Sequence, residues 1–173
     1  PPFVNIHLSA LIKKAVNIPV AAIGRIIEPV GAAKVIEEGK ADLVALGRAL
    51  LCDPEWPRKA QTGRFDDIRE CIACNQGCMD MLRKQKPITC LQNAEVGREK
   101  EFRIQRSVRP KRVAIVGGGP AGLEAARIAA LRGHQVTVYE KEKELGGQVS
   151  VGRIPPHRSE LGKVTDYLTH QVK

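Results

Sequence analysis

Four of the five cysteines lie within twenty residues of one another, close enough along the chain to bind one inorganic centre. Their spacing is Cys71-x2-Cys74-x3-Cys78-x11-Cys90, so three follow in quick succession and the fourth comes later. That arrangement is typical of [4Fe–4S] cubanes, whereas zinc sites usually pair one C-x2-C with a distant second one. The spacing therefore predicts an iron–sulfur cluster, with zinc or unmetallated thiols as the alternatives. The fifth cysteine, Cys52, is expected at a strand end away from the cluster, as an inert packed thiol.

The segment Gly117–Gly122 has the sequence GGGPAG and so carries the pattern G-x-G-x-x-G. A predicted strand, Val113–Val116, precedes it, and a predicted helix follows it. In that context the first glycine makes a tight turn and the second lets a pyrophosphate approach the backbone. The third glycine permits close packing of helix on strand. The helix N-terminus adds amide donors and partial positive charge, so the segment predicts a dinucleotide site.

Glu140 completes this second pattern. It ends the next predicted strand, Gln135–Tyr139, and lies 23 residues after Gly117. This is the place for a carboxylate that accepts hydrogen bonds from the adenosine ribose hydroxyls. The β-α-β unit that these elements form has the expected length of about 30 residues.

A third pattern is a repeated dipeptide, Gly24-Arg25 and Gly47-Arg48, with a separation of 23 residues. Each pair follows a short apolar run that reads as a strand. Glycine exposes backbone amides and arginine offers a planar charged fork, so a phosphate could bind between adjacent strand ends. In barrel enzymes the loops after the last two strands often bind a phosphate. An ordinary pair of surface arginines is the alternative.

The elements that must position these residues alternate between helix and strand. The first part of the chain predicts helix, strand, helix, strand and helix. This order is typical of an α/β fold with parallel strands. The ranges are Ile6–Val16, Ile18–Ile23, Pro29–Glu38, Asp42–Leu46 and a helix that opens at Asp53-Pro54-Glu55. Two strands cannot make a well-covered parallel sheet, so the chain is expected to be a segment of a longer protein.

Composition excludes several classes of protein. The chain has 173 residues, 43% hydrophobic and 27% charged, so disorder is not expected. No apolar stretch has transmembrane length and no signal peptide is present, which favours a cytoplasmic protein with no membrane partner. Of the net charge of +9, +6 falls between Met79 and Arg112, with ten Lys or Arg against four Asp or Glu. That stretch has one aromatic residue, so it does not indicate nucleic-acid binding.

In this order of parts the chain resembles the iron–sulfur flavoprotein oxidoreductases, a family that includes bacterial 2,4-dienoyl-CoA reductase, 2-enoate reductase and trimethylamine dehydrogenase. The stretch KRVAIVGGGPAGLEAARIAALRGHQVTVYEKEKELGGQ carries much of the resemblance. The resemblance implies that residues 1–62 end an FMN-binding (β/α)8 TIM barrel and that residues 63–98 hold the cluster. It further implies a linker at 99–110 and the start of a Rossmann-like FAD-binding domain at 111–173.

The resemblance also assigns residues to cofactors. Arg25, Gly47 and Arg48 match contacts to the FMN phosphate, and the four clustered cysteines match the cluster ligands. The FAD contacts that it implies are Gly117, Gly119, Ala121, Gly122, Glu140, Gln148 and Arg158. The proton donor of the reductases belongs to barrel residues outside this chain, so no catalytic residue is named and the chain alone is expected to be inactive.

The resemblance implies that electrons pass from NAD(P)H to FAD, then singly through the cluster to FMN, and then to an activated C=C bond. The substrate would be a small enoyl-type molecule. The x2-x3-x11 spacing and the intact ELGGQ favour the reductases. The alternative is a demethylating enzyme of the trimethylamine dehydrogenase or betaine type, acting on a methylated amine. A stand-alone electron-transfer or zinc module is a second alternative.

Overall fold

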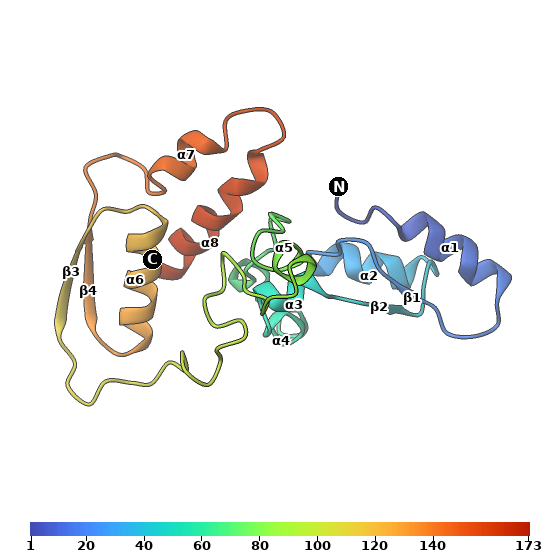
Figure 1. Ribbon diagram of the computed structural model, residues 1–173, viewed down its shortest axis with the longest axis horizontal. Helices are drawn as coiled ribbons and strands as arrows, with labels where there is room; N and C mark the ends of the chain where they lie inside the picture. The colour runs from blue at the N-terminus through green and yellow to red at the C-terminus, as the bar shows by residue number, and fades with distance from the viewer. The chain divides into compact units, whose positions relative to one another are not determined.

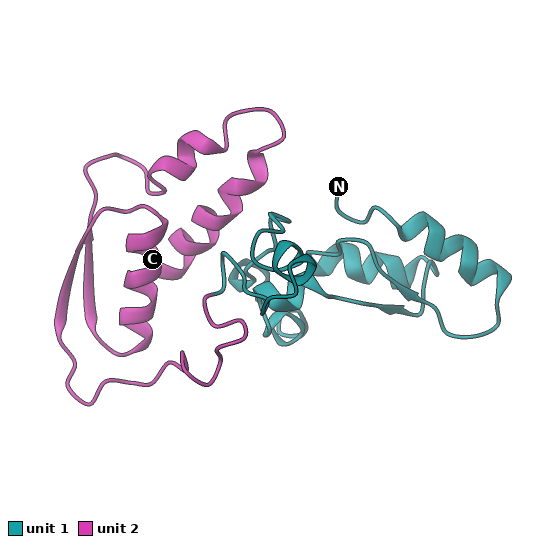
Figure 2. Ribbon diagram, in the orientation of Figure 1, with its two compact units in different colours: residues 1–93 teal, residues 94–173 magenta.

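The computed structural model describes all 173 residues and divides into two compact units, Pro1–Asn93 and Ala94–Lys173 (Figure 2). The division falls inside the segment 63–98 that the sequence predicts to hold the cluster. Residues 94–98 belong to the second unit, while all five cysteines belong to the first.

The first unit begins with two helix–strand repeats, in the predicted order. Helix α1 is followed by strand β1, and helix α2 by strand β2; two short helices, α3 and α4, come next (Figure 1). The strands are parallel, with Ala21 opposite Leu43 and Ala22 opposite Val44. The bounds are α1 Ile6–Ala15, β1 Ala21–Ala22, α2 Pro29–Glu37, β2 Leu43–Val44, α3 Arg48–Cys52 and α4 Trp56–Gln61.

Both strands are shorter than the apolar runs that predicted them. Pro19 has no backbone N–H to give to a ladder. The Val20 N–H donates to the Asp42 carboxylate at 2.8 Å, in place of a backbone carbonyl. Each strand also has only one neighbour, and only Ala21–Ala22 and Leu43–Val44 form the regular ladder.

The helix boundaries follow from local chemistry. Pro29 occupies the first turn of α2, and the Glu28 side chain caps that turn by accepting from the Gly31 N–H at 2.9 Å. Helix α4 begins at Trp56, later than the Asp53 cap predicts, because Pro57 must lie in the first turn of a helix. The core of the unit gathers where these elements meet, around Ile6, Ala22, Ile26, Val35 and Trp56.

Helix α3 corrects one expectation. Cys52 is the last residue of this helix and not the end of a strand. The chain turns at Gly47, whose carbonyl accepts from the backbone N–H groups of Leu50 and Leu51. The apolar run Leu43–Leu51 therefore divides into a strand and a helix, which its composition alone does not reveal. The segment 63–98, called the cysteine segment below, then contains the 3₁₀ turn η1 (Phe65–Asp67) and the short helix α5 (Met79–Arg83).

The second unit contains the predicted β-α-β unit. Strand β3 (Arg112–Val116) pairs in parallel with β4 (Gln135–Tyr139), and α6 (Pro120–Leu131) connects them. Three further elements were not predicted: α7 (Gln148–Gly152), the 3₁₀ turn η2 (Ser159–Leu161) and α8 (Gly162–Val172). Helix α8 packs on α6, where fully buried Leu123 meets Tyr167 and Leu168. No helix in the chain is long and apolar enough to span a bilayer.

Candidate functional site

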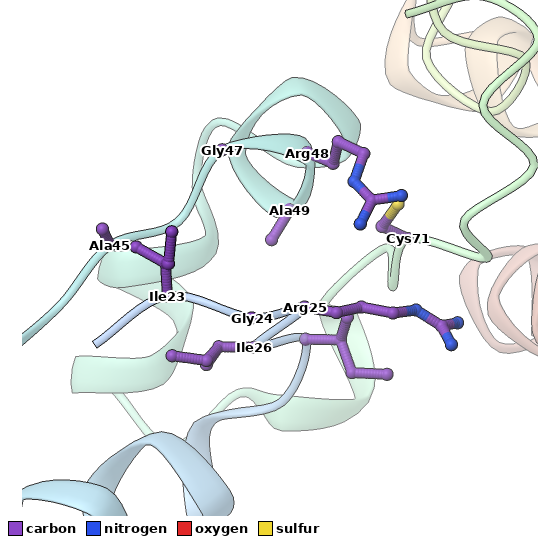
Figure 3. Close-up of a pocket in the computed structure, with 10 residues that line it drawn as sticks. Ile23, Gly24, Arg25, Ile26, Ala45, Gly47, Arg48, Ala49 and Cys71 are labelled. Atoms are coloured by element: carbon purple, nitrogen blue, oxygen red, sulfur yellow. The ribbon is translucent and has the colours of Figure 1, made fainter. Parts of the chain in front are cut away.

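The two Gly-Arg pairs line one pocket at the ends of the paired strands (Figure 3). Because β1 and β2 run parallel and in register, the residues that follow them emerge at the same edge. The pocket has a volume of about 390 Å³. Apart from the two pairs it is lined by Cys71 and by the apolar residues Ile23, Ile26, Ile27, Ala45 and Ala49. The sequence predicted the two pairs as one site but did not predict Cys71 in it.

The backbone at the first pair is held in an uncommon conformation. Gly24 has φ +138° and Arg25 has φ +57°, both in the left-handed half of backbone space. A Cβ added at Gly24 would lie 2.7 Å from the Asn5 backbone nitrogen. The N-terminal segment fixes this turn, since the N–H groups of Phe3 and Val4 donate to the carbonyls of Arg25 and Gly24. The glycine is therefore required both by its φ and by its neighbours.

Arg48 connects the pocket to the cysteine segment. Its Nη1 donates to the Asn75 side-chain oxygen at 2.7 Å, and Figure 3 shows its guanidinium beside Cys71. Burial raises the pKa of the Cys71 thiol, while hydrogen bonding from the Ala73 N–H and the positive charge of Arg48 act in the opposite direction. One arginine thus faces both the pocket and the first clustered cysteine.

The cysteine segment folds back on itself so that its early and late parts meet. The Thr89 N–H donates to the Gly77 carbonyl at 2.6 Å. A Cβ at Gly77 would lie 2.6 Å from the Thr89 carbonyl oxygen. The backbone at Gly77 and the backbone at Thr89 therefore approach so closely that only glycine fits at position 77. Between the cysteines, Ala73 and Asn75 have φ of +52° and +62°. These tight turns bring the stretch that holds Cys71, Cys74 and Cys78 next to the residue before Cys90.

All four clustered cysteines are free thiols of intermediate burial. Cys71 interacts electrostatically with Cys78 and Cys90, while no three His, Cys, Asp or Glu side chains surround a point as the ligands of a single ion do. A cubane is bound at its corners, so its sulfur ligands are spread around several atoms. Four free, half-buried thiols on two meeting loops are a donor set that fits such a cluster.

Cys52 lies beside the cysteine segment, which corrects the expectation that it lies away from the other four cysteines. The residue is 1% exposed, and its thiol is hydrogen-bonded to that of Cys90 and accepts a bond from Gln92 Nε2 at 3.4 Å. The bond to Cys90, together with burial, raises the pKa of the Cys52 thiol, and the same bond lowers the pKa of Cys90. Sequence separation concealed this contact, because 37 residues lie between Cys52 and Cys90 before the chain returns to the end of α3.

Asp53, the residue after α3, holds the start of the cysteine segment in place. Its carboxylate is 4% exposed and accepts from Lys59 Nζ at 2.6 Å and from the Arg69 backbone N–H at 2.8 Å. It also accepts from the Glu55 N–H at 3.0 Å, while Lys59 Nζ donates to the Asp67 carbonyl at 2.8 Å. One buried ion pair thereby joins α3, α4 and the chain just before Cys71.

We expect Asp53→Ala to destabilise the protein by about 3–5 kcal/mol, because it leaves the Lys59 ammonium buried without its carboxylate. Two backbone N–H groups also lose their acceptor. The measurement is the midpoint of chemical denaturation of the full-length protein. Arg58→Ala is the matched control, since its pair with Glu55 is largely exposed (69% and 49%) and should contribute under about 1 kcal/mol. Equal midpoints for the two variants would contradict the stabilising role of the buried Asp53–Lys59 pair.

The glycine-rich turn of the second unit has the geometry that its pattern predicts. Gly117 has φ +103°, and Gly119 precedes the first residue of α6. A Cβ at Gly122 would collide with the Gly117 carbonyl oxygen, so this glycine permits the close packing of helix on turn. At Gly119 the nearest atom to an added Cβ is the Gly147 Cα, at 4.0 Å. The side of the turn at Gly119 is therefore open.

Glu140 supports this turn through the backbone. Its carboxylate accepts from the N–H groups of Gly118 at 2.6 Å, Lys141 at 2.8 Å and Glu142 at 3.0 Å. The bonds from Glu142 and Gly118 lower the pKa of Glu140 and keep it charged. The sequence predicted a carboxylate at this strand end for a ribose; the structure shows this carboxylate bonded to the glycine turn, and the bond to a ribose stays a prediction.

A hollow of about 830 Å³ opens beside the turn and is lined by Gly117, Glu140, Gly147 and Gln148. A further glycine pair, Gly146-Gly147, packs against the glycine-rich turn, since the Gly146 N–H donates to the Gly118 carbonyl at 2.8 Å. These two glycines were not predicted as site residues, although their φ of +123° and +51° explains their type. Ala121 lies in the first turn of α6, and Arg158 is exposed at the start of η2, outside the residues that line the hollow.

Comparison with known proteins gives a family for each unit. Residues 4–67 match the NADH:flavin oxidoreductase / NADH oxidase family, and residues 115–170 match an NAD(P)-binding Rossmann-like domain. Over these residues the chain is similar to the NADH:flavin oxidoreductases. It spans about a quarter of the length of the curated relatives that it matches.

Individual relatives are similar over nearly the whole chain. Bilirubin reductase of Mediterraneibacter gnavus is 46% identical over 94% of this chain and 25% of its own length. N,N-dimethylglycine/sarcosine dehydrogenase of Chromohalobacter salexigens is 39% identical over 95% of this chain and 24% of its own. Among solved structures, a 2-naphthoyl-CoA reductase superposes with a TM-score of 0.94 at 36% identity, covering 99% of this chain and 26% of that one.

Proposed function

We propose that this chain is the central part of an NAD(P)H-dependent oxidoreductase that holds FMN, FAD and a [4Fe–4S] cluster and reduces an activated C=C bond. The observation that carries the proposal is the single pocket in which both Gly-Arg pairs meet Cys71. A phosphate site and a cluster ligand on one wall are what an enzyme needs to pass electrons between a flavin and a cluster. In this proposal residues 1–62 form the end of a TIM barrel and residues 63–98 hold the cluster. Residues 99–110 link this part to a Rossmann-like domain, which begins with residues 111–173.

Arg25 and Arg48 would hold the FMN phosphate, with backbone amides at Gly24 and Gly47. Apolar residues line the rest of the same pocket. Cys71, Cys74, Cys78 and Cys90 would bind the cluster. When bound, these groups supply two-electron chemistry at the flavins and one-electron transfer at the cluster, in the order NAD(P)H, FAD, cluster, FMN and alkene.

The second unit would hold the FAD pyrophosphate over the glycine turn. The N-terminus of α6 directs backbone N–H groups at that place, and the open side at Gly119 leaves room for the phosphates. Glu140 would accept from the ribose hydroxyls while it keeps its bonds to the turn. Gln148, at the start of α7, lines the same hollow.

The test uses the full-length protein purified without oxygen. We expect FMN, FAD and about four irons per chain, and we expect NAD(P)H oxidation that depends on an enoyl-type substrate such as an α,β-unsaturated acyl-CoA. Stoichiometric zinc without iron, or a protein without flavin, would refute the proposal.

An enzyme that oxidises a methylated amine is the second candidate. It is favoured by the 39% identity to a protein named as an N,N-dimethylglycine/sarcosine dehydrogenase. Flavin reduction by dimethylglycine without NAD(P)H, and no activity on enoyl substrates, would establish this candidate instead of the reductase.

We expect Glu140→Ala to lower the FAD content of the full-length protein several-fold, because the carboxylate bonds both the glycine turn and, in this proposal, the ribose. FMN content should not change, since its phosphate is assigned to the other unit. The measurement is flavin released by denaturation and separated by chromatography. An equal loss of FMN and FAD would indicate general misfolding, and unchanged FAD would place the nucleotide elsewhere.

A further inference from the structure

Arg69 is a charged residue buried between the two ends of the cysteine segment. It is 8% exposed and lies two residues before Cys71. Its Nη1 donates to the carbonyl of Gln92 at 2.6 Å, two residues after Cys90, and its backbone N–H donates to Asp53. The side chain therefore reaches across from the first clustered cysteine to the last.

Neighbouring bonds fix the position of this guanidinium. Gln92 Nε2 donates to the Glu70 carbonyl at 2.8 Å. With the bond from Arg69 to the Gln92 carbonyl, this makes two hydrogen bonds between Gln92 and the stretch Arg69-Glu70. Asn93 Nδ2 donates to the Leu51 carbonyl at 3.0 Å and ties the same stretch to α3. A side chain held at both ends in this way has little freedom to move its charge away.

The charge of Arg69 acts on two of the cysteine sulfurs. Its guanidinium interacts electrostatically with the sulfurs of Cys90 and Cys52. The adjacent Asp53 carboxylate has its own cation, Lys59 Nζ, at 2.6 Å, so it does not act as an uncompensated negative charge there. In a partly buried site such charges are screened less than in water.

We propose that Arg69 sets the reduction potential of the cluster by holding a fixed positive charge beside the Cys90 sulfur. The inference rests on the proposed cluster at the four cysteines. Reduction adds one negative charge to the cluster and its thiolates, and a nearby cation stabilises that reduced form more than the oxidised form. Arg69 accordingly raises the potential and eases the entry of an electron.

The test is a redox titration of the cluster in the full-length protein, followed by its electron paramagnetic resonance signal. Arg69→Gln removes the charge and should move the midpoint to a more negative potential. Arg69→Lys keeps a charge near the sulfur and should restore the midpoint most of the way to that of the unaltered protein. Arg83→Gln is the matched control, because Arg83 is a cation of the same segment with its side chain 76% exposed. Its midpoint should not move.

Iron content is measured first on every variant. A parent protein without iron would refute the cluster itself, and this inference with it. With iron present, an unchanged midpoint in Arg69→Gln would overturn only the role of Arg69. An equal shift in Arg69→Lys and Arg69→Gln would also overturn it, because the bond to Gln92 and not the charge would then be responsible. Loss of iron from Arg69→Gln alone would assign Arg69 to cluster assembly and would likewise overturn the proposal.

Discussion

Cys78→Ser should abolish the cluster of the full-length protein, with loss of essentially all iron and of the broad visible absorption. A serine oxygen is a much poorer ligand for iron than a thiolate, and Cys78 lies where the Gly77–Thr89 contact closes the loop. Electron flow from NAD(P)H to the alkene should stop, whereas reduction of bound FAD by NAD(P)H should continue. The measurements are iron per chain after anaerobic reconstitution, and the rates of the two partial reactions.

Cys52→Ser is the control for this prediction, because Cys52 is the one cysteine outside the three-then-one pattern. It should retain its iron. Cys78 is a sharper target than Cys90, since the Cys52 thiol contacts Cys90 and could replace it as a ligand. Full iron in Cys78→Ser, or complete loss in Cys52→Ser, would mean that the ligand set is wrong.

Two substitutions in the glycine turn should separate nucleotide binding from folding. Gly119→Val should remove FAD almost completely and leave the second unit folded, because the nearest protein atom to an added Cβ is 4.0 Å away. The added side chain would instead occupy the space of the pyrophosphate. Gly122→Val should remove FAD and also unfold the unit, because its Cβ would collide with the Gly117 carbonyl.

The readouts are FAD and FMN content and the thermal unfolding of the full-length protein. FMN should be retained in Gly119→Val. A destabilised Gly119→Val would contradict the open side of the turn that the structure shows, and retained FAD would contradict the assignment of the pyrophosphate. A stable Gly122→Val would show that the packing of α6 on the turn tolerates a side chain.

The features that sequence predicted well are those with a short-range cause. The β-α-β unit around Gly117–Gly122 follows from alternating apolar residues and from glycines at fixed offsets, so both strands and α6 appear at the expected places. The convergence of Gly24-Arg25 and Gly47-Arg48 was predictable too, because parallel strands end at one edge.

The features that were missed depend on contacts between distant residues. Cys52 joins Cys90, and Asp53 joins Arg69, only because the cysteine segment returns to α3 after many residues. Such returns are set by turns at Ala73, Asn75 and Gly77, and no periodic pattern marks them. Helix α3 itself is only five residues long, too short for a helical period to be visible.

Helix α3 begins at Arg48, in the pocket that the two Gly-Arg pairs line, and ends at Cys52, followed by Asp53 against the cysteine segment. Its five residues span roughly 7–8 Å, and each residue turns the chain by about 100°. An insertion or deletion of one residue would therefore rotate Asp53 away from Lys59 and Arg69 while Arg48 stayed in the pocket. Changes of chain length should therefore be rejected here during evolution, because α3 sets the interval between the pocket and the cysteine segment.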